Sequence, residues 1–186
     1  MGKKLVLTGG FPCQDVSAAD PKRVGITGLR SGLWKQMYEA IGFLQPDYAI
    51  VENVPGLRKW LGTILGDLAE VGYNAQWHSI PARAVGAPHR RDRLWIVAYP
   101  QSKSGLQAYT MYDSIGKKLQ ARIATGGIYW DEMAKENWSL PDRWITWSDD
   151  GVSRRLACIA YGNAIVPQVA QVIFEVIKEL EERIAP

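Results

Sequence analysis

The sequence predicts an α/β fold built around a doubly wound sheet, and three observations support this. Through the first 100 residues, short apolar segments that resemble buried strands alternate with longer amphipathic segments that resemble helices. The chain has 186 residues, which is enough for one domain with a hydrophobic core. Its hydrophobic content of 47% is ordinary for a globular protein, and no apolar run approaches the roughly 20 residues that cross a membrane.

The expected elements follow from local patterns. Residues 4–9 are expected to form a buried strand, followed by a long loop at residues 10–31 that is rich in Gly, Pro, Ser and Asp. Apolar residues at helical spacing predict a helix from about Gly32 to Leu44. Further segments are expected to form a strand at Tyr48–Glu52, a helix at Leu57–Val71 ended by Gly72, strands at Tyr73–Pro81 and Arg93–Tyr99, and a last helix from near Pro167 to Ile184. Residues 100–150 are polar, and no long element is expected there.

Charge and cysteine content narrow the functional classes. The formal net charge is +3, and residues 1–100 carry 12 Lys or Arg against 8 Asp or Glu, which is compatible with a polyanionic partner. Two cysteines do not form a disulfide framework, so a reducing compartment is expected. The N-terminus leads directly into a strand and shows no cleavable signal, and we therefore expect a cytoplasmic protein.

A cysteine and a glutamate each follow a predicted strand. Cys13 comes after the first strand and a Gly9-Gly10 turn, and Glu52 ends the second strand. In a parallel sheet both would lie at the carboxyl edge, where α/β folds bind ligands. A thiol nucleophile and a carboxylic acid facing one pocket suit covalent attack on a ring that is protonated as it is attacked. A buried structural cysteine and an ion-paired glutamate are the alternative interpretations.

Two arginines precede the strand at residues 93–99. Arg91 and Arg93 are two residues apart, so on an extended segment their side chains point the same way. Two guanidinium groups facing one pocket suit a phosphate or a base carbonyl, whereas a solvated basic turn is the alternative.

These motifs occur in the order found in the C5-cytosine DNA methyltransferases, which the chain resembles. The matches are Pro12-Cys13-Gln14, Glu52-Asn53-Val54, His89 to Arg93 and Gly162-Asn163-Ala164. The resemblance covers residues 4–100 and 151–180. It implies a partial Rossmann-like, S-adenosylmethionine-dependent methyltransferase sheet with a small irregular target-recognition segment. It also implies double-stranded DNA as the partner, no metal, and a role in the DNA methylation of restriction-modification in a bacterial or phage-infected cell.

The resemblance also implies residue roles. Cys13 would add to C6 of a cytosine flipped out of the duplex, Glu52 would protonate N3, and C5 would take the methyl group. Arg93 would contact the base carbonyl and Arg91 would steady Cys13. The remaining expected contacts are Pro12, Gln14, Asn53 and His89 for the substrate, and Asn163 with Pro12 for the cofactor. His89 stands where the family usually has Gln.

The resemblance further predicts three parts of the chain. Residues 1–100 would be the catalytic half of the methyltransferase domain, residues 101–150 a small target-recognition segment, and residues 151–186 a return segment and helix that complete the catalytic domain. Candidate DNA contacts in or near the middle part are Lys103, Lys117, Lys118, Arg122 and Arg143. Four tryptophans of this part, Trp130, Trp138, Trp144 and Trp147, suit a small core better than duplex contacts.

The sequence departs from the family in the cofactor-binding motifs. The Phe-x-Gly-x-Gly turn and the strand–helix units that bind the cofactor in the family have no match here. Without those units, Lys4 to Thr8 would be an apolar, unpaired sheet edge. We therefore consider three hypotheses: one subunit of a split enzyme completed by a separate N-terminal half or a homodimer, a truncated inactive product, or a non-catalytic DNA-binding module.

Other enzyme classes fit the residues less well. Thymidylate synthases also attack a pyrimidine with a cysteine, but the Glu-Asn-Val and Gly-Asn-Ala motifs do not belong to them. A cysteine hydrolase would need a partnering histidine, and neither His78 nor His89 lies in a recognisable protease pattern. The two cysteines and two scattered histidines also give no credible zinc site.

Overall fold

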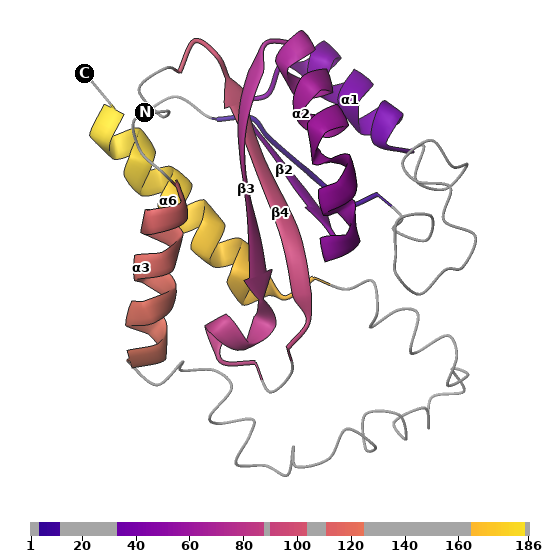
Figure 1. Cartoon of the computed structure of the whole chain (residues 1–186). Helices are drawn as coiled ribbons and strands as arrows, with labels where there is room; N and C mark the ends of the chain where they lie inside the picture. The colour runs from indigo at the N-terminus through magenta and orange to yellow at the C-terminus, as the bar shows by residue number, and fades with distance from the viewer. Residues whose placement is uncertain (1–3, 12–32, 88–89, 104–110, 125–164, 185–186) are drawn as a thin grey trace, which may run out of the picture. The chain divides into compact units, whose positions relative to one another are not determined.

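A computed structural model describes residues 4–11, 33–87, 90–103, 111–124 and 165–184 (Figure 1). The elements are β1 (Val6–Gly9), α1 (Leu33–Leu44), β2 (Tyr48–Asn53), η2 (Pro55–Trp60), α2 (Leu61–Glu70), β3 (Tyr73–Pro81), η3 (Ala82–Val85), β4 (Asp92–Pro100), α3 (Met111–Ala124) and α6 (Pro167–Ile184), where η denotes a 3-10 helix. They belong to two compact units, of which the first holds Met1–Ile80, Asp92–Tyr112 and Ile184–Pro186, and the second Pro81–Arg91 and Asp113–Arg183. Among these helices none has the length and apolar character to cross a bilayer.

The first unit is organised by a four-stranded sheet in the order β1-β2-β4-β3. β1 and β2 pair in parallel, as the alternating strand–helix pattern predicts, whereas β4 runs antiparallel to β2. β3 and β4 form an antiparallel hairpin, and the backbone amide of Gln101 after β4 donates to the carbonyl of Gly72 before β3. The mixed, partial Rossmann-like α/β sheet confirms the predicted fold class.

Two helices cover one face of this sheet (Figure 1). The core joins Trp34 and Ile41 of α1 and Ile64 and Leu68 of α2 to alternate residues of the two central strands, which are Ala49 and Val51 on β2 and Leu94, Ile96 and Ala98 on β4. The intervening residues Ile50 and Val97 are buried as well, so both faces of the central strands are covered. Strands buried on both faces read as continuous apolar runs, which explains why these two strands could be predicted from sequence.

The segment predicted as one helix, Leu57–Val71, is divided in the structure. Its first turn and a half forms η2, and Trp60 leaves helical geometry at φ −111° and ψ 3° before α2 begins. Pro55 at the start of η2 suits a first helical position, where its missing N–H has no intrahelical partner. Gly72 has a φ of 86° after α2, which is the left-handed stop that the sequence predicts.

The second unit contains η3, α3 and α6. The helix α3 lies within residues 100–150, where no long element was expected, so this prediction is wrong for residues 111–124. Met111, Ile115, Leu119 and Ile123 recur at four-residue spacing, so a helical periodicity was present in the sequence and the prediction missed it. Of these residues, Met111 and Ile115 are buried. Lys118 joins α3 to α6 through two ion pairs. Its Nζ lies 2.6 Å from Oε1 of Glu179 and 3.6 Å from Oε2 of Glu175. The hydrogen bond to Glu179 raises the pKa of the Lys118 ammonium.

Candidate functional site

The sheet brings three chain segments to one edge. Because β1 and β2 are parallel, the ends of both strands, Gly9 and Asn53, lie at the same carboxyl edge. Because β4 is antiparallel to β2, its first residues lie at that edge too, and Asn53 is opposite Leu94. The edge that the sequence predicts for a ligand is therefore formed by the residues after β1, the end of β2 and the start of β4.

Glu52 and Arg93 form an ion pair at this edge. Glu52 is opposite Trp95, and Arg93 has the same strand parity as Trp95, so Glu52 and Arg93 project from one face of the sheet. The Nε atom of Arg93 lies 2.9 Å from Oε1 of Glu52, and the side chains are 19% and 15% exposed. Nη1 of Arg93 also donates to the carbonyl of Asp92 at 2.9 Å. A guanidinium held from two sides, beside a mostly buried carboxylate, fixes the direction in which that acid points.

Asn53 connects the end of β2 to the segment that leaves β1. Its side chain is buried, its Nδ2 donates to the carbonyl of Phe11 at 3.0 Å, and its Oδ1 accepts from the amide of Val54 at 2.8 Å. The Phe11 ring packs on Trp34, with ring centroids 5.8 Å apart. Trp34 in turn donates from Nε1 to Asp67 on α2 at 2.7 Å. Phe11 is therefore held by its backbone and by its ring, immediately before Pro12 and Cys13.

Gly10 lies directly against the acid. A Cβ atom built on Gly10 would be 3.2 Å from the carbonyl oxygen of Glu52 and 3.2 Å from its Oε2. The backbone leading to Cys13 and the Glu52 side chain are thus in close approach. The sequence indicates only a Gly9-Gly10 turn at this position, and nothing in the local pattern identifies which neighbour requires the glycine.

The other predicted site residues divide into two groups. Pro12, Cys13, Gln14, His89 and Asn163 lie outside the described residues. Arg91 belongs to the second unit and has a φ of 32°, and β4 begins only at Asp92. The prediction that Arg91 and Arg93 share an extended segment is therefore wrong, because the left-handed backbone at Arg91 interrupts the alternation.

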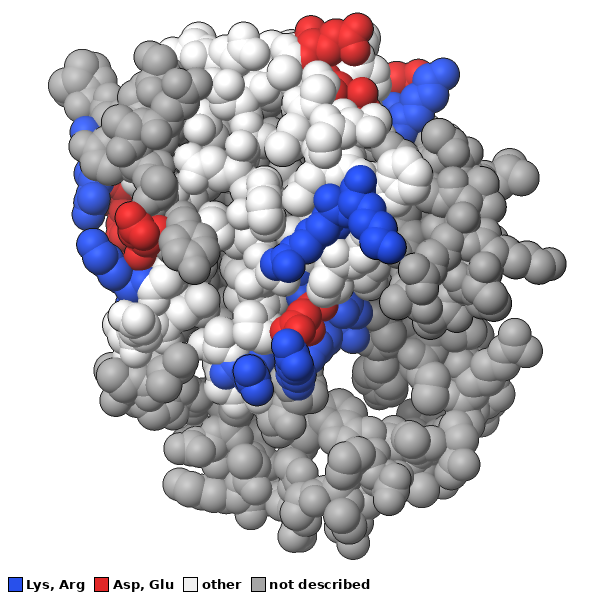
Figure 2. All heavy atoms as spheres, viewed as in Figure 1, with Lys and Arg blue, Asp and Glu red and all other residues white. Residues whose placement is uncertain are grey.

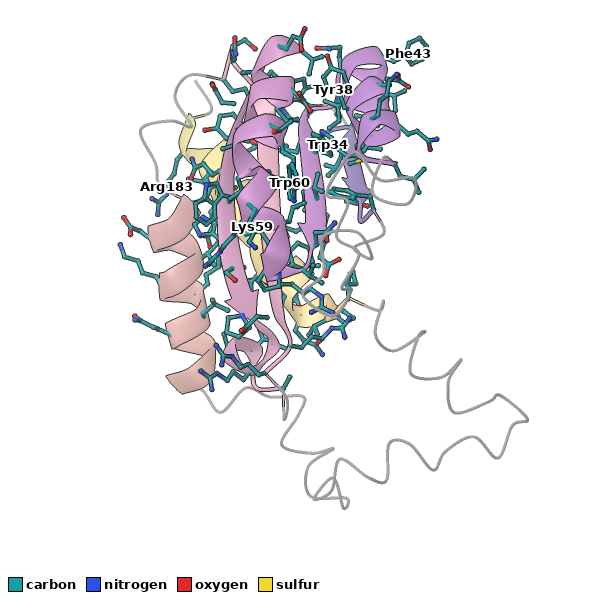
Figure 3. The ribbon with its side chains drawn as sticks, turned by 45° about the vertical axis from the view of Figure 1, so that its right-hand side comes forward. Trp34, Tyr38, Phe43, Lys59, Trp60 and Arg183 are labelled. Carbon is teal, nitrogen blue, oxygen red and sulfur yellow. The ribbon has the colours of Figure 1, made fainter. Side chains whose placement is uncertain are left out.

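Two of the lysines that are predicted to contact DNA form intramolecular ion pairs. Lys103 lies 3.5 Å from Asp47 and 4.3 Å above the Tyr48 ring, and Lys118 pairs within the second unit, so both have intramolecular roles. Arg58 and Lys59 are exposed on η2, directly after the end of β2. Figure 2 shows basic side chains on the surface over this part of the first unit, and Lys59 is labelled in Figure 3. The predictions missed these two residues, although their position just after Glu52-Asn53-Val54 was a usable signal.

Comparison with known proteins assigns the family. The model of the C-5 cytosine-specific DNA methylase family matches residues 4–126, which is well over half of the chain. The chain is 36% identical over 141 residues to the type II methyltransferase M2.BsuMI of Bacillus subtilis, a match that covers 68% of this chain and 36% of the relative. The sheet is a partial Rossmann-like α/β sheet, which is consistent with this family. The chain belongs to the C5-cytosine-specific DNA methyltransferase family.

Two further matches likewise cover only part of each relative. The type II methyltransferase M.Sau3AI of Staphylococcus aureus is 36% identical over 106 residues, which cover 52% of this chain and 26% of the relative. A solved structure of the Entamoeba histolytica methyltransferase EhMeth is 22% identical, with a TM-score of 0.42, and the match covers 50% of this chain and 31% of that one. In each comparison the matched region covers about a third or less of the relative.

Proposed function

We propose that this chain is the catalytic part of a DNA (cytosine-5-)-methyltransferase that works through a covalent adduct on Cys13. The observation that carries the proposal is the arrangement of Glu52 at the carboxyl edge. Its carboxylate is held by Arg93 and lies against Gly10, three residues before the cysteine. Because Phe11 is fixed, two residues of chain limit the Cα of Cys13 to about 7 Å from the Cα of Phe11. The nucleophile and the acid would then share one pocket.

The chemistry assigns one role to each residue. The Cys13 thiolate would form a bond to C6 of a flipped cytosine while a proton moves from Glu52 to N3, which leaves electron density on C5. S-adenosylmethionine supplies the methyl group that C5 takes. A base then removes the C5 proton, the bond between Cys13 and C6 breaks to release the thiolate, N3 returns its proton to Glu52, and the aromatic ring is restored. Arg91 would steady the cysteine, and Asn163 with Pro12 would contact the cofactor.

Arg93 would position both the base and the acid. Its guanidinium lies against the Glu52 carboxylate, with Nε 2.9 Å from Oε1. The same guanidinium would donate a hydrogen bond to the base carbonyl, so the base and the carboxyl group would be held beside each other. Pro12, Gln14, Asn53 and His89 would complete the base pocket.

DNA binding would use the exposed basic residues near the edge. Arg58 and Lys59 are exposed, and Arg58 lies 5.7 Å from the centre of the Trp77 ring, which limits its movement. Side chains of this kind contact phosphates and set the register of a duplex without reading its sequence. The duplex would thereby be held with its target cytosine near Glu52.

We infer that a second polypeptide completes the sheet beyond β1. β1 is the edge strand of the described sheet. The carbonyl of Leu5 accepts from the amides of Asp47 and Tyr48, so by strand alternation the backbone groups of Val6 and Thr8 face the open edge. Leu33 and Leu44 of α1 are exposed. They lie on the same stripe of the helix as Met37, whose side chain lies next to Gly9 of β1. An open strand and an uncovered apolar helix stripe, side by side, suit a further strand–helix unit.

Phe43 extends this apolar surface. Its side chain is 88% exposed and points away from the sheet at the end of α1 (Figure 3). The matched region is about a third of M2.BsuMI, so that relative has ample chain to supply strand–helix units. The proposed partner is a methyltransferase N-terminal half that binds S-adenosylmethionine. A homodimer pairing two β1 strands is the competing arrangement.

Transfer of labelled methyl groups tests the proposed function. The purified chain is incubated with S-adenosylmethionine and mixed-sequence DNA, alone and with a separately expressed methyltransferase N-terminal half that carries the Phe-x-Gly-x-Gly motif. We expect label only with the added half, and we expect Cys13→Ala to abolish it. Label from the chain alone would contradict the need for a partner. DNA binding with no label under either condition, unchanged in Cys13→Ala, would instead support a non-catalytic DNA-binding remnant.

A proline on the outer edge of β1 tests the partner surface. Thr8→Pro removes an N–H that faces the open edge and leaves the pairing with β2 intact, because edge strands tolerate proline at such positions. We expect at least a tenfold loss of binding to the added half, measured by calorimetry, with Thr8→Ser as the matched control. Equal binding by the two variants would contradict strand addition at β1.

A further inference from the structure

Gly10 has no backbone reason to be glycine. Among the described glycines, positive φ values occur at Gly72 and Gly86 and not at Gly10. An alanine could therefore adopt the backbone conformation of Gly10 without left-handed strain. What an alanine would meet is the glutamate: the backbone carbonyl of Glu52 and Oε2 of its side chain, both at 3.2 Å from the added carbon.

A side chain at position 10 would limit the Glu52 carboxylate on a second side. Oε1 lies against Nε of Arg93, and Oε2 lies 3.2 Å from the place that a Cβ atom on residue 10 would occupy. The segment that carries Gly10 is itself fixed, because the Phe11 carbonyl accepts from buried Asn53 and the Phe11 ring packs on Trp34. The segment around residue 10 is therefore not free to move away from an added methyl group. Either the carboxylate must rotate, or the segment leading to Cys13 must shift by a few tenths of an ångström.

We propose that Gly10 is a positioning residue that sets the distance between the Glu52 carboxylate and the nucleophile segment. This inference rests on the proposed function for its catalytic meaning. Group transfer that needs an acid and a nucleophile on one ring is sensitive to small displacements, since a shift of 1 Å can cost about a hundredfold in rate. A side chain at position 10 would separate the two groups while leaving the core in place.

The chain offers two matched glycines as controls. At Gly62 and at Gly66, both on α2, an added Cβ would have nothing within 4 Å. Gly62→Ala and Gly66→Ala control for the general effect of replacing glycine by alanine.

The kinetic test compares the three variants in the complete enzyme, with the added N-terminal half. We expect Gly10→Ala to lower kcat for methyl transfer about tenfold, with the KM for DNA changed less than about twofold. Gly62→Ala and Gly66→Ala should stay within about threefold of the parent kcat. A structural role alone would not separate kcat from KM in this way. A kcat for Gly10→Ala equal to that of Gly62→Ala would overturn the proposal.

A thermal cycle tests the contact without any activity. Melting temperatures are measured for the parent, Gly10→Ala, Glu52→Ala and the double variant. We expect Gly10→Ala to lower the melting temperature by about 2–4 °C in the parent and by clearly less beside Glu52→Ala, where the carboxylate is gone. Equal shifts in both backgrounds would overturn the contact with the carboxylate, because the backbone carbonyl of residue 52 is present in both. If the complete enzyme transfers no methyl group, the proposed function fails, and this cycle alone decides whether Gly10 restricts the acid.

Discussion

Glu52→Gln is expected to reduce methyl transfer at least about a hundredfold while the protein stays folded. Glutamine has nearly the same shape and can still approach Arg93, but its amide cannot deliver a proton to N3 of the base. General acid catalysis typically contributes a factor of about 10² to 10⁴, so this is the expected size of the loss. The measurement is single-turnover transfer of labelled methyl groups by the complete enzyme, at saturating DNA and cofactor.

Glu39→Gln is the matched control for that experiment. Glu39 lies on α1, where it pairs with Lys35 at 3.7 Å, and both side chains are well exposed. Exposed pairs of this kind contribute about 0–1 kcal/mol, so its loss should leave both stability and rate unchanged. If Glu52→Gln keeps the parent rate, Glu52 is not the acid, and its pairing with Arg93 is structural. If Glu52→Gln fails to fold, the double variant Glu52→Arg with Arg93→Glu is measured instead. A structural ion pair would be restored by this exchange, and a catalytic acid at position 52 would not.

The central strands could be predicted because burial leaves a direct trace in the sequence. Tyr48–Asn53 and Asp92–Pro100 are nearly continuous apolar runs, and the structure buries both of their faces. The helix α1 was predictable for a similar reason, since its apolar stripe has helical spacing. The helix α3 was missed although Met111, Ile115, Leu119 and Ile123 have helical spacing, because the polar character of residues 100–150 as a whole was given more weight than this stripe. Its pairing with α6 through Lys118 is a long-range contact that no local pattern encodes.

The site was predictable in its residues and less so in its contacts. Glu52 and Asn53 were identified from their place at the end of a strand, and the parallel pairing of β1 with β2 puts them at the expected edge. The antiparallel direction of β4 was not predicted, yet it is what places Arg93 beside Glu52. The close approach of Gly10 to Glu52 joins residues 42 positions apart. It depends on sheet register and on a side-chain rotamer, neither of which can be seen in a tripeptide motif.

Asn53→Ala is expected to lower both stability and methyl transfer, because one buried side chain serves both. The substitution removes the donor to the Phe11 carbonyl and the acceptor for the Val54 amide. Leaving buried backbone groups without partners costs about 1–3 kcal/mol each, so a loss of about 3 kcal/mol in the free energy of unfolding is expected. Urea unfolding measures it. Asn74→Ala is the matched control, since the buried Nδ2 of Asn74 has no partner among the described residues and its removal should cost little.

Asn53→Asp separates the two roles of this side chain. A carboxylate can still accept from the Val54 amide, but it cannot donate to the Phe11 carbonyl, so the end of β2 keeps its local turn while the connection to the nucleophile segment is lost. We expect Asn53→Asp to lose at least as much stability as Asn53→Ala, because a buried carboxylate then faces the Phe11 carbonyl oxygen, and to transfer methyl groups at least tenfold more slowly than the parent. A parent-like rate in Asn53→Asp would show that the connection to Phe11 does not position Cys13. The segment would then be held by the packing of Phe11 on Trp34, and Phe11→Leu would become the variant that slows the reaction.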